Sequence, residues 1–115
     1  MALKILHNPR CSKSRATLAL LKDKGYDPEV ILYLETPPDA EQLESILSSL
    51  GSSPREFMRK GEPEYAEQGL ADPDLSDAQL INAMIATPKL IERPIVLANG
   101  KAAVGRPPES VLSIL

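Results

Sequence analysis

The sequence has one cysteine, one histidine and no tryptophan, and only 3% of its 115 residues are aromatic. A single thiol excludes an internal disulfide, and one cysteine with one histidine is too few for a zinc site. Because aromatic residues are scarce, the core must be aliphatic. The chain also lacks an apolar run near the ~20 residues that span a bilayer, and its N-terminus lacks the apolar core of a signal peptide. We expect a cytoplasmic protein without a metal or a membrane anchor, folded as one domain over 1–115.

Charge is unevenly distributed along the chain. The net charge is −3, but residues 1–24 carry six Lys or Arg against one acid, a balance of +5, and the remainder carries −8. The acidic total argues against general nucleic-acid binding. The basic N-terminal segment would attract a small anion, although a solvated basic helix face explains the same charges.

The first third of the chain predicts a strand–helix–strand unit. Residues 3–7 and 29–33 have the pattern of short apolar strands, and they flank a helix over 12–24 that Ser12 can cap and Gly25 can end. Such a unit implies a parallel strand pair with a right-handed crossover.

The middle of the chain predicts mainly helices, recognised by their capping residues and by apolar residues at helical spacing. The expected elements are a helix from about 39 to 51, a short helix from 53 to about 59, a loop over 61–75, and a helix from 76 that ends before Pro88.

The last part predicts a hairpin and a helix. Residues 95–98 and 101–104 are joined by Asn99-Gly100, which is the favoured two-residue turn. A final helix is expected from 107 onward, with Val111, Leu112 and Leu115 as its apolar face. The whole order is β-α-β, a helical insertion over about 36–92, and β-β-α. This order predicts an α/β protein with a thioredoxin-like fold and a helical insertion between its two halves.

The only cysteine lies in the stretch HNPRCSKSR, in the turn between the first strand and the first helix. Unpaired amides and the dipole at a helix N-terminus favour an anion, and with nearby cations they lower a thiol pKa from about 8.5 to ~3.5–7.5. Arg10, Lys13, Arg15 and His7 are the local cations to consider. A reactive Cys11 is therefore favoured over an inert small core residue, which a lone cysteine often is.

Ser14 decides what kind of redox chemistry Cys11 can perform. Dithiol oxidoreductases of this fold use Cys-x-x-Cys, and here the last position of that motif is Ser14. Its hydroxyl can donate to a thiolate but cannot form a disulfide. The second thiol must therefore come from another molecule.

Three arginines stand beside glycines or prolines in expected turns or element ends: Arg59, Arg93 and Arg106. Guanidinium groups match oxyanions bidentately, so their convergence on one thiolate would form an oxyanion pocket; three solvated surface arginines are the alternative. Pro94 is either the cis-proline that this fold places beside its active site or an ordinary trans-proline at a strand entry. His7 either tunes the thiolate or only ends the first strand.

Five ordered motifs, HNPRCSKSR, YLETPP, MRKGEPEYAEQGLA, IERPIVL and GRPPESVLSIL, resemble those of the glutaredoxin-coupled arsenate reductases and their close relatives. The resemblance extends over essentially the whole chain and implies the same thioredoxin-like fold. It implies that the cysteine attacks arsenate to form a thiol–arsenate adduct, that glutathione attacks the adduct, and that glutaredoxin reduces the mixed species and releases arsenite. Glutathione is then a co-substrate and glutaredoxin a partner. We expect a monomer without a bound cofactor and without nucleic-acid or membrane partners.

The resemblance also implies a role for each matching residue: Cys11 as the nucleophile, His7 and Ser14 as supports of its thiolate, Pro94 as the cis-proline, and Arg59, Arg93 and Arg106 as the anion-binding arginines. Two alternatives stay open. One is a related glutathione-dependent oxidoreductase with another substrate. The other is an Spx-type regulator that binds RNA polymerase, although the Cys-x-x-Cys switch typical of those regulators is interrupted here by Ser14.

Overall fold

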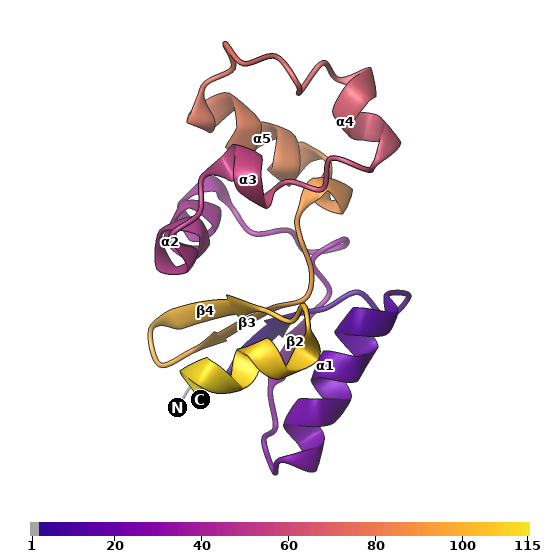
Figure 1. Cartoon of the computed structure of the whole chain (residues 1–115), viewed down its shortest axis with the longest axis vertical. Helices are drawn as coiled ribbons and strands as arrows, with labels where there is room; N and C mark the ends of the chain where they lie inside the picture. The colour runs from indigo at the N-terminus through magenta and orange to yellow at the C-terminus, as the bar shows by residue number, and fades with distance from the viewer. Residues whose placement is uncertain (1–2) are drawn as a thin grey trace. The chain divides into compact units, whose positions relative to one another are not determined.

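The computed structural model describes residues 3–115, and the chain divides into two compact units (Figure 1). The first unit contains the chain up to Thr36 together with Arg93–Leu115, and the second contains Pro37–Glu92. The bounds of the second unit are close to those expected for the helical insertion.

The first unit is built on a mixed sheet with the strand order β2-β1-β3-β4. β1 pairs in parallel with β2, with Lys4 opposite Glu29, and it pairs antiparallel with β3, with Leu6 opposite Ile95. The expected parallel pair is confirmed, although both of its strands are shorter than expected. The strands are β1 (Lys4–Leu6), β2 (Glu29–Ile31), β3 (Ile95–Ala98) and β4 (Lys101–Val104).

The hairpin between β3 and β4 is confirmed, and its turn shows why the sequence predicts it. Asn99 and Gly100 have φ values of 55° and 72°. Two positive φ angles define the type I′ turn, for which Asn-Gly is the preferred pair. The Asn99 side chain also donates to the Ile114 carbonyl at 2.9 Å, which ties the turn to the end of the chain.

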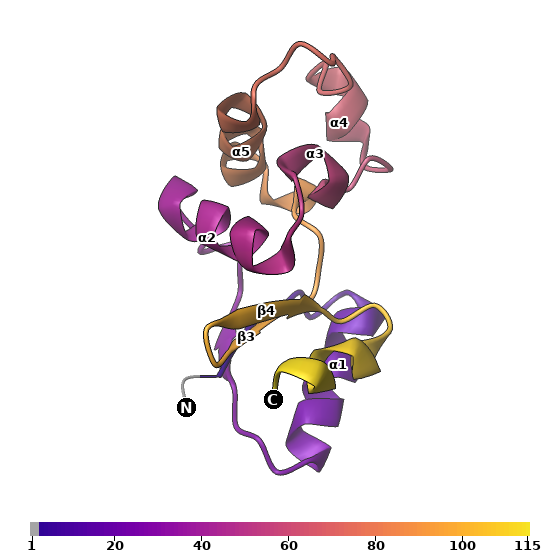
Figure 2. The ribbon, with the colours of Figure 1, turned by 60° about the vertical axis from the view of Figure 1, so that its left-hand side comes forward.

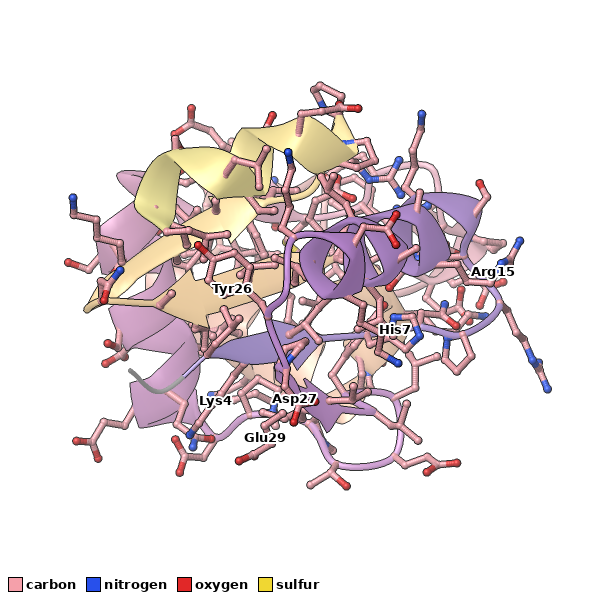
Figure 3. The ribbon with its side chains drawn as sticks, turned by 90° about the horizontal axis from the view of Figure 1, so that it is seen from below. Lys4, His7, Arg15, Tyr26, Asp27 and Glu29 are labelled. Atoms are coloured by element: carbon pink, nitrogen blue, oxygen red, sulfur yellow. The ribbon has the colours of Figure 1, made fainter. Side chains whose placement is uncertain are left out.

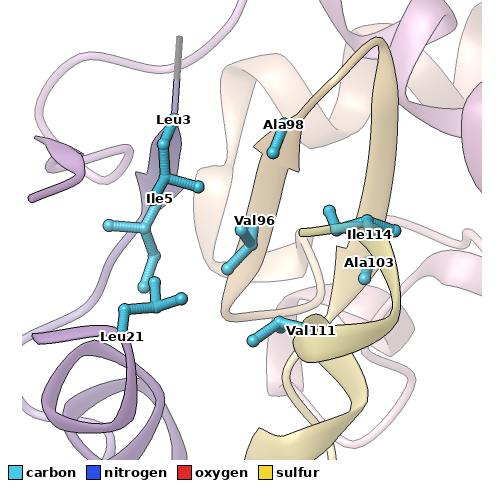
Figure 4. Packing of buried hydrophobic residues seen from close by; sticks show 8 residues of the cluster. All are labelled: Leu3, Ile5, Leu21, Val96, Ala98, Ala103, Val111 and Ile114. Carbon is cyan, nitrogen blue, oxygen red and sulfur yellow. The ribbon is translucent and has the colours of Figure 1, made fainter. Parts of the chain in front are cut away.

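Two helices, α1 (Ser12–Asp23) and the 3₁₀-helix η2 (Pro108–Ile114), lie on the same face of the sheet (Figures 1 and 2). Figure 4 shows the side chains that fill the space between the sheet and these helices. They are aliphatic, as the scarcity of aromatic residues requires. The cluster consists of Leu3, Ile5, Leu21, Val96, Ala98, Ala103, Val111 and Ile114.

Two expectations for these helices were wrong. The N-cap of α1 is Cys11, with extended backbone angles of φ −92° and ψ 123°, and not Ser12. The last element is a 3₁₀-helix, and its buried residues are Val111 and Ile114. These two lie three residues apart, which matches the three residues per turn of a 3₁₀-helix.

The second unit contains four short α-helices and one 3₁₀-helix: α2 (Ala40–Leu50), α3 (Pro54–Phe57), α4 (Pro63–Glu67), α5 (Asp77–Ala86) and η1 (Pro88–Leu90). Helices α2, α3 and α5 each begin with a capping box, in which an Asp or Ser N-cap and a Gln or Glu three residues later satisfy each other's backbone amides. α4 lies inside the stretch expected to be a loop. It is a little over one turn long and buries no residue, so no apolar periodicity marks it in the sequence.

Gly105, which follows β4, allows three segments of the first unit to approach one another. Its N–H donates to the Pro94 carbonyl at 2.9 Å. A Cβ at this position would lie 2.7 Å from Pro94 Cγ and would overlap the hydroxyl of Thr17 in α1. Pro94 and Thr17 are both buried, so neither side chain can move aside easily.

We therefore expect Gly105→Ala to lower the free energy of unfolding by about 1–3 kcal/mol, the usual cost of overpacking a core. Urea unfolding measures the change. Gly61→Ala is the matched control, because a Cβ there meets no atom within 4 Å. Equal stabilities for the two variants would show that the contact of Gly105 with α1 is looser than the structure indicates.

Candidate functional site

Cys11 lies where the turn after β1 meets the first residue of α1. The turn is held by Asn8, whose carbonyl accepts from the Cys11 N–H at 3.0 Å and whose side chain accepts from the Arg10 N–H at 3.0 Å. Asn followed by Pro favours such a turn, because the Asn side chain can bond to the backbone two residues later. The Cys11 residue is 9% exposed, so only a small part of it meets solvent.

Two of the three predicted arginines come to this sulfur from distant parts of the sequence. Arg106 Nη2 lies 3.7 Å from Cys11 Sγ, and Arg106 Nε donates to the Arg93 carbonyl at 2.7 Å. The Arg93 guanidinium also lies close enough to the Cys11 sulfur for each group to shift the pKa of the other toward its charged form. The Arg93–Pro94 peptide bond is cis, as expected, and so is the Arg106–Pro107 bond. The structure therefore brings Cys11, Arg93 and Arg106 into one site, with Pro94 directly beside it.

The surroundings of Cys11 favour its ionised form. Burial raises the pKa of the Cys11 thiol, but the backbone amide of Ser14, the Arg93 guanidinium and the backbone amide of Lys13 outweigh it, so the pKa lies below its ordinary value. The sequence correctly predicts an electropositive helix start. The cation that lowers the pKa is Arg93, however, and not one of the local basic residues.

Arg93 has a second neighbour that the sequence does not single out. Burial opposes the charge of Arg93, but contacts with Cys11 and with Tyr33 outweigh it and raise the pKa of Arg93 above its ordinary value. Tyr33 is fully buried. It follows β2 with no motif around its hydroxyl, so the sequence indicates only a packing role.

His7 and Ser14 form a buried hydrogen-bonded pair beneath the Cys11 turn. His7 Nδ1 lies 2.6 Å from Ser14 Oγ, and the same oxygen accepts from the Asn8 N–H at 3.0 Å. Burial, and then the charges of Arg15 and Lys22, lower the pKa of His7. A neutral imidazole is therefore favoured, and His7 does not act as a cation on the thiolate. Figure 3 shows His7 and Arg15 at the N-terminal end of α1, with Tyr26 and Asp27 at the other end.

The Ser14 hydroxyl thus holds the turn, while the Ser14 backbone amide acts on the thiolate. We expect Ser14→Ala to reduce stability by about 1–3 kcal/mol, because it leaves the buried Asn8 N–H and His7 Nδ1 without this partner. The Cys11 pKa should change little, since the backbone amide remains. Urea unfolding and a thiolate titration measure the two effects, with the exposed Ser12→Ala as control. A raised thiol pKa at unchanged stability would instead mean that the hydroxyl acts on the sulfur.

The third predicted arginine, Arg59, belongs to the second unit and is held there by two carboxylates. Its Nε lies 3.4 Å from Glu62 Oε1, and its Nη1 lies 3.0 Å from Glu92 Oε1. Its backbone N–H donates to the Leu90 carbonyl at 2.9 Å. Neither glutamate is among the residues that the sequence singles out. The available signals are an acid three residues after Arg59 and an acid just before Arg93. The role of Arg59 as an anion ligand stays a prediction.

The first unit thus presents a nucleophile and an anion site together. A thiolate supplies the nucleophile, and two guanidinium groups beside it can bind the oxygens of an oxyanion. Within residues 3–115, no group of three or more His, Cys, Asp or Glu residues is arranged to hold a metal ion. In the same range, no helix has the length and apolar character needed to cross a bilayer.

Comparisons with known proteins agree with this site and fold. Residues 6–114 match the model of the ArsC family. The protein named "Arsenate reductase" from Neisseria meningitidis serogroup A is 53% identical, over 98% of this chain and 97% of its own length. "Uncharacterized protein YfgD" of Escherichia coli (strain K12) is 61% identical, over 98% of this chain and 96% of its own. The solved structure titled "Arsenate reductase from Vibrio cholerae" is 54% identical and superimposes with a TM-score of 0.97, covering 100% of this chain and 98% of that one. The thioredoxin-like fold class is confirmed, and the chain belongs to the ArsC family.

Proposed function

We propose that the protein reduces arsenate to arsenite, with glutathione and glutaredoxin supplying the thiols. The observation that carries the proposal is the position of Cys11, the only thiol of the chain, at the start of α1 with the guanidinium groups of Arg93 and Arg106 on its sulfur. Relatives at 53% and 47% identity are named arsenate reductases, which supports arsenate as the oxyanion.

The first step is the attack of the Cys11 thiolate on arsenic. A sulfur–arsenic bond forms, and one arsenate oxygen leaves as water. Arg93 and Arg106 bind the remaining oxygens and offset their charge as the adduct forms. Arg59 is the third anion ligand in this proposal, on the basis of the resemblance of its motif.

The second and third steps use thiols from outside the chain. The glutathione thiol replaces a second arsenic oxygen, which leaves as water. A glutaredoxin thiolate then attacks the glutathione sulfur: a disulfide forms, the sulfur–arsenic bond breaks, and its electron pair reduces As(V) to As(III). Hydrolysis of the remaining sulfur–arsenic bond releases arsenite and restores the Cys11 thiolate. The two electrons that arsenic gains come from the two thiols that become the disulfide.

The remaining predicted residues have supporting roles. His7 and Ser14 fix the turn that carries Cys11, and Pro94 lies between Arg93 and β3. The proposal needs no bound cofactor, and one copy of the chain supplies every proposed ligand, so a monomer suffices. We place the reaction in the cytoplasm, where glutathione and glutaredoxin are kept reduced.

A coupled assay tests the proposal. NADPH oxidation is followed in the presence of glutathione, glutaredoxin and glutathione reductase, with arsenate added last. The proposal predicts that oxidation requires arsenate and stops when either glutathione or glutaredoxin is left out. An NADPH oxidation rate that arsenate does not change would contradict it.

A glutathione-dependent reductase with another substrate is the second candidate. Guanidinium groups bind tetrahedral oxyanions as a class, and the relative at 61% identity has a name that states no substrate. Replacing arsenate in the same assay by other reducible oxyanions, or by a mixed disulfide of glutathione, separates the two. Stoichiometric, redox-dependent capture of RNA polymerase would favour the Spx-type alternative instead.

A further inference from the structure

Three cations lie within four residues of Cys11 along the chain, and the proposed reaction steps do not use them. Arg10 directly precedes Cys11, Lys13 follows two residues later, and both side chains are exposed. Arg15 is also exposed, and its Nη1 donates to the Pro9 carbonyl at 2.9 Å, so its guanidinium lies against the turn that carries Arg10. We call these three residues the cationic rim.

The charge of the cationic rim is not offset locally. The sequence has no acid from residue 1 to residue 22. Among the described residues, no ion pair includes a member of the rim, whereas Arg59 and Lys89 pair with glutamates in the second unit. Uncompensated surface charges of one sign raise the local concentration of ions of the opposite sign.

The cationic rim and the inner arginines, which are Arg93 and Arg106, act at different places. Arg93 and Arg106 contact the sulfur itself, and Arg93 is the side chain whose charge lowers the Cys11 pKa. The rim residues are exposed, and among the described residues no hydrogen bond joins one of their side chains to the sulfur. They therefore act on a molecule that approaches Cys11 rather than on the thiolate.

The geometry points to a small thiol that carries carboxylate groups as the ligand of the cationic rim. Its carboxylates would bind Arg10, Lys13 and Arg15, while its thiol reaches the group attached to Cys11. This inference rests on the proposed function, because it names the surface that recognises the reducing thiol. It assigns the oxyanion to the inner arginines and the reductant to the outer cations.

A thiol–disulfide exchange without arsenate tests the inference. Methyl methanethiosulfonate converts Cys11 to its methyl disulfide. An added thiolate attacks the methyl sulfur, a new disulfide with the methylthio group forms, and Cys11 leaves as the thiolate. The added thiols are thioglycolate, 2-mercaptoethanol and 2-mercaptoethylamine, whose attacking forms carry two, one and no net negative charges. Rates are corrected for the thiolate fraction and intrinsic nucleophilicity of each thiol by the same reaction on a small methyl disulfide.

The cationic rim predicts that the corrected rates fall in the order thioglycolate, 2-mercaptoethanol, 2-mercaptoethylamine, and that added salt reduces the differences. The double variant Arg10→Gln/Lys13→Gln should lose about 3- to 10-fold of the thioglycolate rate and little of the 2-mercaptoethylamine rate. Lys24→Gln/Lys101→Gln is the matched control, because it removes the same charge from exposed positions of the first unit away from Cys11.

Two results would overturn the inference. One is an unchanged preference for thioglycolate in the rim variant. The other is an unchanged thiol series together with a raised KM for arsenate, which would assign the rim to the oxyanion. A protein that fails to reduce arsenate can still give the predicted thiol series, so failure of the proposed function is recognised separately.

Discussion

Replacing Cys11 with serine should abolish arsenate-dependent NADPH oxidation, with a loss of at least about 10³-fold in kcat/KM. A serine hydroxyl is not ionised at neutral pH, so the helix start and the guanidinium groups have no anion to stabilise. The chain has no second cysteine that could take over. The measurement is the coupled assay on wild type and Cys11→Ser at the same protein concentration.

Thermal unfolding of both proteins is the control for this experiment. Serine is nearly the size of cysteine, so the variant should unfold at a similar temperature and still bind oxyanions weakly. Full activity in a folded Cys11→Ser protein would rule out the covalent adduct and with it the proposed mechanism.

The second large effect is expected at the two arginines on the sulfur. Arg93→Ala and Arg106→Ala should each lower kcat/KM for arsenate by about 10²–10³-fold, because each removes a donor to the oxygens whose charge develops as the adduct forms. Arg93→Lys should recover only part of the loss, since an ammonium group lacks the bidentate fork. Steady-state kinetics and urea unfolding are measured on each variant.

Arg55→Ala is the control for a structural arginine, because Arg55 is expected to affect stability and not catalysis. Its Nη1 donates to the Leu70 carbonyl at 2.7 Å and its Nη2 to the Asp72 carbonyl at 2.6 Å, so it holds the loop after α4. Arg55→Ala should lose stability, by about 1–3 kcal/mol, and retain kcat/KM. If Arg93→Ala and Arg106→Ala behave like Arg55→Ala, the two arginines are structural rather than substrate ligands.

Local signals explain which parts of the fold the sequence predicts. The Asn99-Gly100 turn and the capping boxes at Ser53 and Ser76 each depend on a few neighbouring residues, and the structure contains all three. The final 3₁₀-helix differs from the expected α-helix, because the choice between them depends on how Val111 and Ile114 pack against the sheet. That packing is a long-range property, which local patterns do not determine.

In the candidate site, too, the sequence predicts what local signals determine and not what long-range contacts determine. The position of Cys11 at a helix start follows from the order of strand and helix, and the sequence predicts it. Three features depend on contacts between distant segments, and residue spacing does not reveal them. They are the contact of Arg106 with the sulfur, the placement of Tyr33 beside Arg93, and the ion pair of Glu92 with Arg59.

The most direct test of the account is the pH titration of the Cys11 thiolate. Ultraviolet absorbance of the thiolate is recorded for wild type, with Cys11→Ser as the blank for the tyrosines. The structure lowers the pKa of Cys11, so the midpoint should lie below the value of about 8.5 for a free thiol, and alkylation by iodoacetamide should fall as the pH drops through that midpoint. A midpoint at or above about 8.5 would contradict the central claim that α1 and Arg93 hold Cys11 as a reactive thiolate.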